Sequence, residues 1–112
     1  MSRLKSRFLV DLLVRRTEAA GGFAAVLAAG DERAGDILVQ CRDRSALGPL
    51  LEKRFATSGG YVWEAVGPED PADSEARTAY VERRRRADPD LWVIELDIAD
   101  APRLVAEWGA LA

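Results

Sequence analysis

Apolar and polar residues alternate most regularly between Leu91 and Ile98. The first set of alternate positions is Trp92, Ile94, Leu96 and Ile98, and the intervening set is Val93, Glu95 and Asp97. In a β-strand these two sets lie on opposite faces of the sheet. Pro89 disfavours the helical conformation at Asp88, so the preceding helix ends there. The pattern predicts an inner strand with one face against helices and the other, carrying the two acids, toward solvent.

Helical periodicity is clearest over residues 4–20. The recurring positions are Leu4, Phe8, Leu9, Leu12, Leu13, Thr17 and Ala20. Ser2 is a suitable N-cap, and Gly21-Gly22 can end the helix in the left-handed conformation. The stripe is typical of a helix that faces a core, and a helix on a membrane surface is the alternative, because residues 3–16 carry five basic groups against one acid.

Two further helices are expected, over residues 70–87 and 102–108. Asp70 followed by Pro71 has the composition of a helix start. The apolar side of this helix is weak and consists of Ala72, Ala76, Ala79, Tyr80 and Ala87. The last helix offers Leu104, Val105 and Trp108 for packing.

Four short segments before residue 67 are predicted to be strands: residues 23–28, 36–42, 50–56 and 61–66. The polar turns GDERAG and TSGG separate members of this set. Short loops favour an antiparallel meander of consecutive hairpins. The predicted fold class is therefore α+β, an antiparallel sheet of about five strands in the order α-β-β-β-β-α-β-α. We expect a single domain over residues 1–112 with helices mainly on one face of the sheet. The first two long helices are expected to cover that face.

Composition narrows the possible chemistry. The chain has 112 residues, a net charge of −3, one cysteine and no histidine. These counts exclude Ser-His-Asp and Cys-His catalysis, an internal disulfide and a multi-cysteine zinc site. No apolar run approaches the roughly 20 residues of a membrane span. We expect a cytoplasmic protein without a signal peptide, because Asp11 and then Arg15 interrupt the apolar N-terminal stretch.

Two segments, RRTEAAGGFAAVLAAGD and RRADPDLWVIEL, together resemble the uncharacterised bacterial family catalogued as domain of unknown function 1491. The resemblance extends over nearly the whole chain. It implies a compact, stand-alone α+β protein, and it implies no activity and no functional residue.

The most conspicuous charged feature is the run Arg83, Arg84, Arg85 and Arg86. Successive helical residues advance by about 100°, so the four side chains point around the helix rather than to one side. Arg83, three residues after Tyr80 and four before Ala87, is expected beside the packed side. Cations near a helix C-terminus favour its dipole, and Asp88 and Asp90 follow for ion pairs. Contact with an anion, RNA or a partner is the alternative. Trp63 and Trp108, if exposed, would add stacking surfaces to such a site.

Candidate catalytic groups are few. Glu95 and Asp97 have the spacing of a Mg²⁺ site, but a solvated strand face explains them as well. A nuclease-like arrangement would use Asp36 with Glu52 and Lys53, yet adjacent strand residues face opposite sides. Cys41 lies on the apolar face of its predicted strand, which favours a buried structural thiol.

These observations lead us to expect a cytoplasmic, non-enzymatic protein-interaction module. It would bind an unknown protein or itself, as a homodimer through a sheet edge or an exposed tryptophan. An arginine-mediated nucleic-acid-binding protein is the second hypothesis, and a metal-dependent nuclease-like enzyme is the third. We expect no cofactor, no bound metal and no membrane association.

Overall fold

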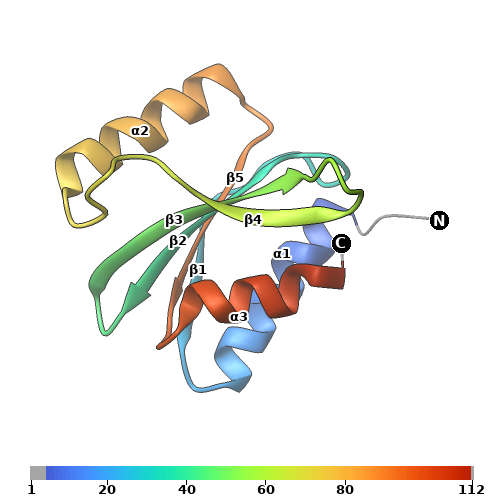
Figure 1. The fold of residues 1–112 in the computed structure, drawn as a ribbon, viewed down its shortest axis with the longest axis horizontal. Helices are drawn as coiled ribbons and strands as arrows, with labels where there is room; N and C mark the ends of the chain where they lie inside the picture. The colour runs from blue at the N-terminus through green and yellow to red at the C-terminus, as the bar shows by residue number, and fades with distance from the viewer. Residues whose placement is uncertain (1–4, 112) are drawn as a thin grey trace.

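The computed structural model describes residues 5–111, which form three α-helices, five strands and a short 3₁₀ turn (Figure 1). The elements in chain order are α1 (Ser6–Ala19), β1 (Phe23–Ala28), β2 (Ile37–Asp43), β3 (Ala46–Phe55), β4 (Tyr61–Val66), α2 (Ser74–Ala87), β5 (Trp92–Asp97), α3 (Ala101–Trp108) and η1 (Gly109–Leu111). The predicted α+β class and order α-β-β-β-β-α-β-α are confirmed. Among the described residues, no helix is long and apolar enough to cross a membrane.

The five strands form one sheet in the order β1-β5-β2-β3-β4. The predicted meander is confirmed for β2, β3 and β4, which pair antiparallel. It is wrong for β1, because β5 lies between β1 and β2 and runs parallel to β2. Strands with both faces covered read as continuous apolar runs. β2 begins with the run Ile37–Val39, and β5 begins with Trp92–Ile94 directly after Leu91; every one of these residues is buried. Both strands occupy the interior of the sheet.

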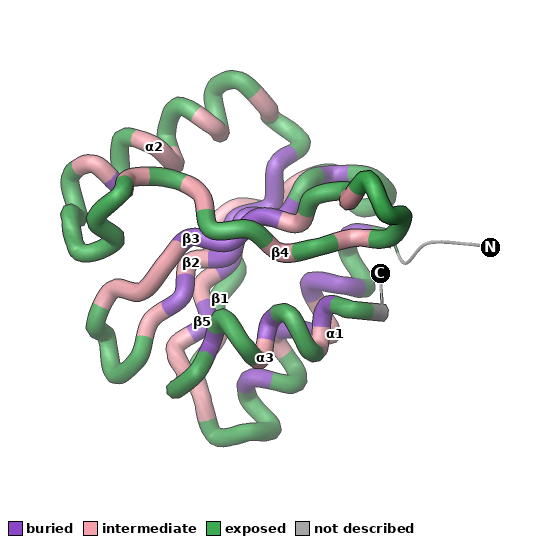
Figure 2. The backbone as a smooth tube through the Cα atoms, in the orientation of Figure 1, coloured by how far each residue is buried: buried purple, intermediate pink, exposed green. Residues whose placement is uncertain are grey.

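Helices cover both faces of the sheet, as Figures 1 and 2 show. α1 and α3 pack on the face that carries Trp92, Ile94 and Leu96, and this cluster is the main core. α2 packs on the opposite face over a smaller cluster of Leu38, Leu50, Leu91 and Val93. Two of the three helices therefore share a face, but α1 shares it with α3, so the predicted sharing of α1 with α2 is wrong. Since α2 covers Val93, the second face of β5 is not simply solvated.

Helix α1 is anchored by polar contacts as well as by its apolar side. Leu9 and Leu13 are buried as predicted, whereas Phe8 is 57% exposed and points away from the core. The buried Ser6 hydroxyl donates to the Gly35 carbonyl at 2.6 Å. Gly21 has φ +89°, the left-handed conformation expected at the helix end. The proposed N-cap Ser2 lies outside the described residues.

Helix α2 begins three residues later than the Asp70-Pro71 pair suggests. Asp73 is the N-cap, and its carboxylate accepts from the Ala76 amide at 3.0 Å. Asp70 instead accepts from the Ala72 amide at 2.9 Å within the preceding turn. Strand β3 also differs from its prediction, because it begins at Ala46 and carries Gly48-Pro49 within it.

Candidate binding groove between helix α2 and strand β1

Strand β1 is an outer strand of the sheet, paired on one side only. Within the described residues, no hydrogen bond joins its other edge to the rest of the chain. Its sequence, FAAVLA, has no charged residue. Phe23 is 78% exposed, Val26 47% and Leu27 49%. The edge therefore combines open backbone groups with exposed apolar side chains.

A bulge shapes the end of β1 next to α2. Val26 pairs with Ile94, whereas Ala28 pairs with Val93, so Leu27 is the extra residue. Ala28 consequently packs with the smaller cluster on the α2 side. Leu27 and Ala28 both line the space between the two elements.

A groove runs between α2 and the end of β1. It contains two adjoining cavities of about 420 and 220 Å³. Ala28, Glu82 and Arg85 line both cavities. The larger is completed by Ala29, Arg86, Asp88, Pro89 and Leu91, and the smaller by Leu27, Gln40, Thr78, Val81 and Val93. The groove thus has apolar residues from the sheet on one side and charged residues from the helix on the other.

Arg77 fixes the first half of α2 to the sheet. Its side chain is buried, and it donates to Gln40 Oε1 at 3.0 Å, to the Gly48 carbonyl and to the Cys41 carbonyl at 3.4 Å. Pro49 has no N–H for the ladder, and β3 bulges there so that two residues oppose Cys41. Arg77 supplies donors to carbonyls at this bulge. Burial lowers the pKa of its guanidinium, and the Arg42 charge lowers it further.

Arg84 fixes the second half of α2. It donates to the buried Glu52 carboxylate and, at 3.0 Å, to the Tyr80 hydroxyl. Arg54 also pairs with Glu52, at 2.8 Å. Burial alone would lower the pKa of Arg84, but its hydrogen bonds with Glu52 and Tyr80 outweigh burial and raise it. Arg77 and Arg84 are seven residues apart, two helical turns, so both point to the sheet.

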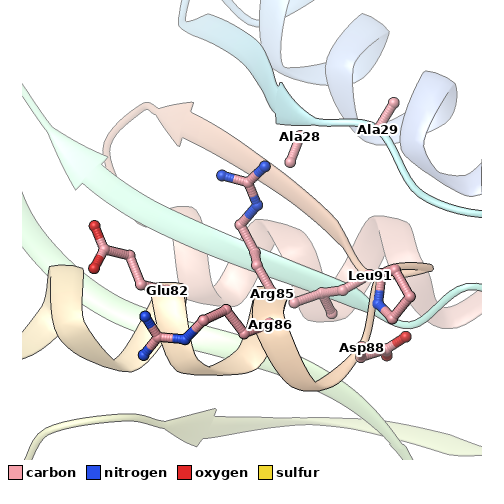
Figure 3. Close-up of a pocket in the computed structure, with 8 residues that line it drawn as sticks. Ala28, Ala29, Glu82, Arg85, Arg86, Asp88 and Leu91 are labelled. Atoms are coloured by element: carbon pink, nitrogen blue, oxygen red, sulfur yellow. The ribbon is translucent and has the colours of Figure 1, made fainter.

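The other three arginines of the run Arg83–Arg86 are exposed. The run therefore divides as its helical geometry requires, although Arg84 rather than Arg83 lies on the packed side. Arg83 lies with its guanidinium 5.8 Å from the centre of the Tyr80 ring. In Figure 3 the Arg85 side chain extends toward Ala28 across the groove. Within the described residues no ion pair joins Arg83–Arg86 to Asp88 or Asp90, so that part of the prediction is wrong; the Asp88 carboxylate accepts from the Asp90 amide instead.

The two tryptophans are not free stacking surfaces. Trp63 and Trp108 are half-buried and pack against the main core. The Trp63 indole lies directly on Gly109, where a Cβ atom would overlap it. The structure thus brings neither tryptophan to the arginine run, since both lie on the opposite face of the sheet.

The carboxylates considered for metal binding have other partners. Glu95 pairs with Arg42, and Asp97 accepts from the Ser45 amide at 3.0 Å. In residues 5–111, no group of three or more Asp, Glu, Cys or His side chains is arranged to hold a metal. The nuclease hypothesis would use Glu52 and Lys53 together. Glu52 pairs with Arg84 on the α2 side, whereas the Lys53 ammonium lies 4.5 Å from the Tyr61 ring centre.

Cys41 is buried within the main core, as its position in the strand pattern predicted. Burial raises the pKa of its thiol to about 12, and the nearby Arg77 charge offsets this in part. A thiol with so high a pKa is almost entirely protonated at neutral pH and is a poor nucleophile.

The family described as protein of unknown function (DUF1491) matches residues 4–106. The chain belongs to the DUF1491 family. A crystal structure and an NMR structure, each of a DUF1491 family protein from Caulobacter crescentus CB15, are similar to this fold. The crystal structure has 35% identity and a TM-score of 0.77, and covers 88% of this chain and 91% of that chain. The NMR structure has 33% identity and a TM-score of 0.76, and covers 90% and 91%.

A solution structure of a protein from A. tumefaciens is also similar, with 34% identity, a TM-score of 0.71, and 88% of this chain and 89% of that chain covered. No curated protein matches the chain. The DUF1491 relatives thus support the fold, and the groove has to be interpreted from its own chemistry.

Proposed function

We propose that the chain is a non-enzymatic protein-interaction module that binds an extended segment of another protein along the outer edge of β1. The observation that carries this proposal is the outer edge of β1 (Phe23–Ala28), which is uncharged, rich in exposed apolar side chains and, within residues 5–111, without a paired strand. An added strand would bond to the open backbone groups, and pockets beside it would select its side chains. Its similar relatives come from bacteria, and we propose that the module acts in a bacterial cytoplasm.

The two edges of the sheet differ in a way that favours β1. Proteins usually protect an unused edge with charges, prolines or bulges. β4, at the far edge, carries Glu64, which pairs with Arg54 at 3.2 Å. β1 has only the bulge at Leu27, and that bulge leaves the stretch Phe23–Val26 regular.

A foreign segment fits this edge better than a second copy of the chain. Two β1 strands could pair through their backbones, but each would bring only uncharged residues to the groove. The groove contains Arg85, a cation from the helix side that β1 cannot complement. We therefore choose a foreign segment as the occupant. Self-association is the competing outcome that the test has to distinguish.

Selection of random linear peptides displayed on phage against the full chain tests the proposal. A synthetic copy of a selected peptide is then titrated by calorimetry, with single backbone N-methyl groups introduced along it. We expect methylation at alternate positions to weaken binding about tenfold or more, because only every second amide would bond to β1. Loss without this alternation, or no selected peptide, would overturn the proposal.

A pair of valine variants locates the binding edge. Val26→Lys places a charge on β1, and Val62→Lys places the same charge on β4 at a similarly exposed valine, 42% against 47%. We expect Val26→Lys alone to weaken peptide binding, by about fivefold or more, because it removes apolar contact beside the added strand. Equal effects would exclude β1. A dimer in light scattering that only Val26→Lys dissociates would identify a second copy as the occupant and overturn the choice of a foreign segment.

A further inference from the structure

We infer that the bound segment carries an acidic side chain that pairs with Arg85. This inference rests on the proposed function, because the segment must first lie beside β1. It concerns which side chain the groove selects rather than whether a strand is added.

Arg85 is placed for this role by the way α2 is held. Arg84 is turned to the sheet by its hydrogen bonds with Glu52 and Tyr80. The next residue lies about 100° further around the helix, and Figure 3 shows its side chain extending toward Ala28 at the end of β1. The orientation of Arg85 is therefore set by a neighbouring residue that is itself fixed.

The Arg85 guanidinium is also available. Glu82 and Asp88 lie three residues away on either side, yet within the described residues neither is in an ion pair with it. Arg77 and Arg84, in contrast, donate to acceptors of the sheet. Among the described arginines, Arg85 lines both cavities of the groove, and no hydrogen bond or ion pair joins it to residues 5–111.

The surroundings of Arg85 favour pairing with a carboxylate over contact with solvent alone. Leu27, Val93 and Leu91 line the same cavities, and a segment laid over them would displace water from around the guanidinium. A carboxylate accepts two parallel hydrogen bonds from an arginine, and such bonds strengthen when water is excluded. Alternate residues of an added strand face the groove, so the acid would occupy one fixed position, level with Ala28.

Glu82 sets a limit on the sequence of the segment. It lines both cavities and would repel a second acid placed farther along the helix. The preferred segment has one acid near Arg85 and uncharged residues at the other groove-facing positions. This pattern differs from a uniformly acidic segment, which a simple basic surface would attract.

The test uses a selected peptide and its counterpart in which the acid is replaced by the matching amide. We expect Arg85→Gln to weaken binding of the acidic peptide about tenfold and that of the amide peptide less than about twofold. Arg83→Gln, an exposed arginine of the same helix that lines neither cavity, serves as the matched control and should leave both affinities unchanged. Glu82→Gln should leave binding of the acidic peptide equal or tighter, because it removes a repelling charge.

The outcomes separate this inference from the proposed function. If Val26→Lys weakens binding but the selected peptides share no acid, or if Arg85→Gln and Arg83→Gln behave alike, the acid inference is wrong and strand addition stands. If Val26→Lys has no effect, strand addition itself is wrong. Unchanged circular dichroism and melting of Arg85→Gln would show that any loss arises from the groove rather than from unfolding.

Discussion

Replacing Arg77 with methionine tests how α2 is held on the sheet. Methionine retains much of the apolar stem of arginine but none of its five N–H donors. The change would leave Gln40 Oε1 and the carbonyls of Gly48 and Cys41 without their donor. An unsatisfied buried polar group costs about 1–3 kcal/mol.

The lower end of that range applies here. Two of the three contacts are only partly buried, and the third, to Cys41, is long at 3.4 Å. About 1 kcal/mol for each acceptor gives a loss of about 3 kcal/mol in the free energy of unfolding. Removing the buried positive charge itself offsets part of this loss, because burial disfavours the charged form, as the lowered pKa shows.

Urea denaturation followed by tryptophan fluorescence measures the effect. Arg83→Met, on the exposed side of the same helix, is the control and should change stability by less than about 0.5 kcal/mol. Arg77→Lys should fall between the two, because one ammonium cannot reach three acceptors arranged for a planar guanidinium. Equal midpoints for Arg77→Met and Arg83→Met would refute the assigned role of Arg77 at the bulge.

Three further predictions concern the core, the thiol and nucleic acid. Trp92→Ala should destabilise the fold by about 3–5 kcal/mol in the same denaturation assay, because the side chain is buried in the core and its indole donates to the Asp31 carbonyl at 2.7 Å. A loss below about 1 kcal/mol would contradict its place in the core. Iodoacetamide should label Cys41 far more slowly in the native protein than in urea at pH 8, and fast native labelling would show that the thiol is accessible. The free energy of unfolding should fall above about pH 9, because the unfolded thiol ionises there and the folded thiol, with a pKa of about 12, does not. A mixed pool of RNA and DNA should bind weakly at low salt and not at physiological salt, because Arg84 is occupied by Glu52. Binding at physiological salt that is lost in the double variant Arg85→Gln, Arg86→Gln would favour the nucleic-acid hypothesis.

Local signals in the sequence predicted the elements well. The alternation around Trp92 located β5, and the glycine pair at Gly21 marked the end of α1, because both depend on neighbouring residues. The bounds of Phe23–Ala28 and Tyr61–Val66 agree with the structure. The start of α2 was misplaced because Asp70 and Asp73 are both chemically able to cap, and the choice depends on how the loop packs.

The order of the strands could not be predicted from local pattern. Whether β5 pairs beside β1 or at the far edge is decided by which strands can bury two faces. The runs Ile37–Val39 and Leu91–Ile94 carried that information, and it became decisive only once α2 was known to cover the second face. The exposed edge of β1, and with it the groove, follows from this placement.

The orientation of the arginine run was predicted only in part. Helical geometry required the four side chains to diverge, which they do. The face that α2 turns to the sheet could not be predicted from its weak apolar side. Two arginines, Arg77 and Arg84, hold the helix on the strands by polar contacts, and the apolar pattern does not identify them. The sequence therefore placed Arg83 beside the packed side, whereas Arg84 is the residue that pairs with the buried Glu52.

Amide hydrogen exchange of the full chain, with and without a selected peptide, tests strand addition at β1 most directly. We predict that the peptide slows exchange of alternate amides within Phe23–Ala28, because those amides gain a hydrogen-bond partner. Exchange within Tyr61–Val66, the other edge of the sheet, should stay unchanged. Slowed exchange confined to β4, or to the exposed end of α2 without any change in β1, would contradict strand addition at β1.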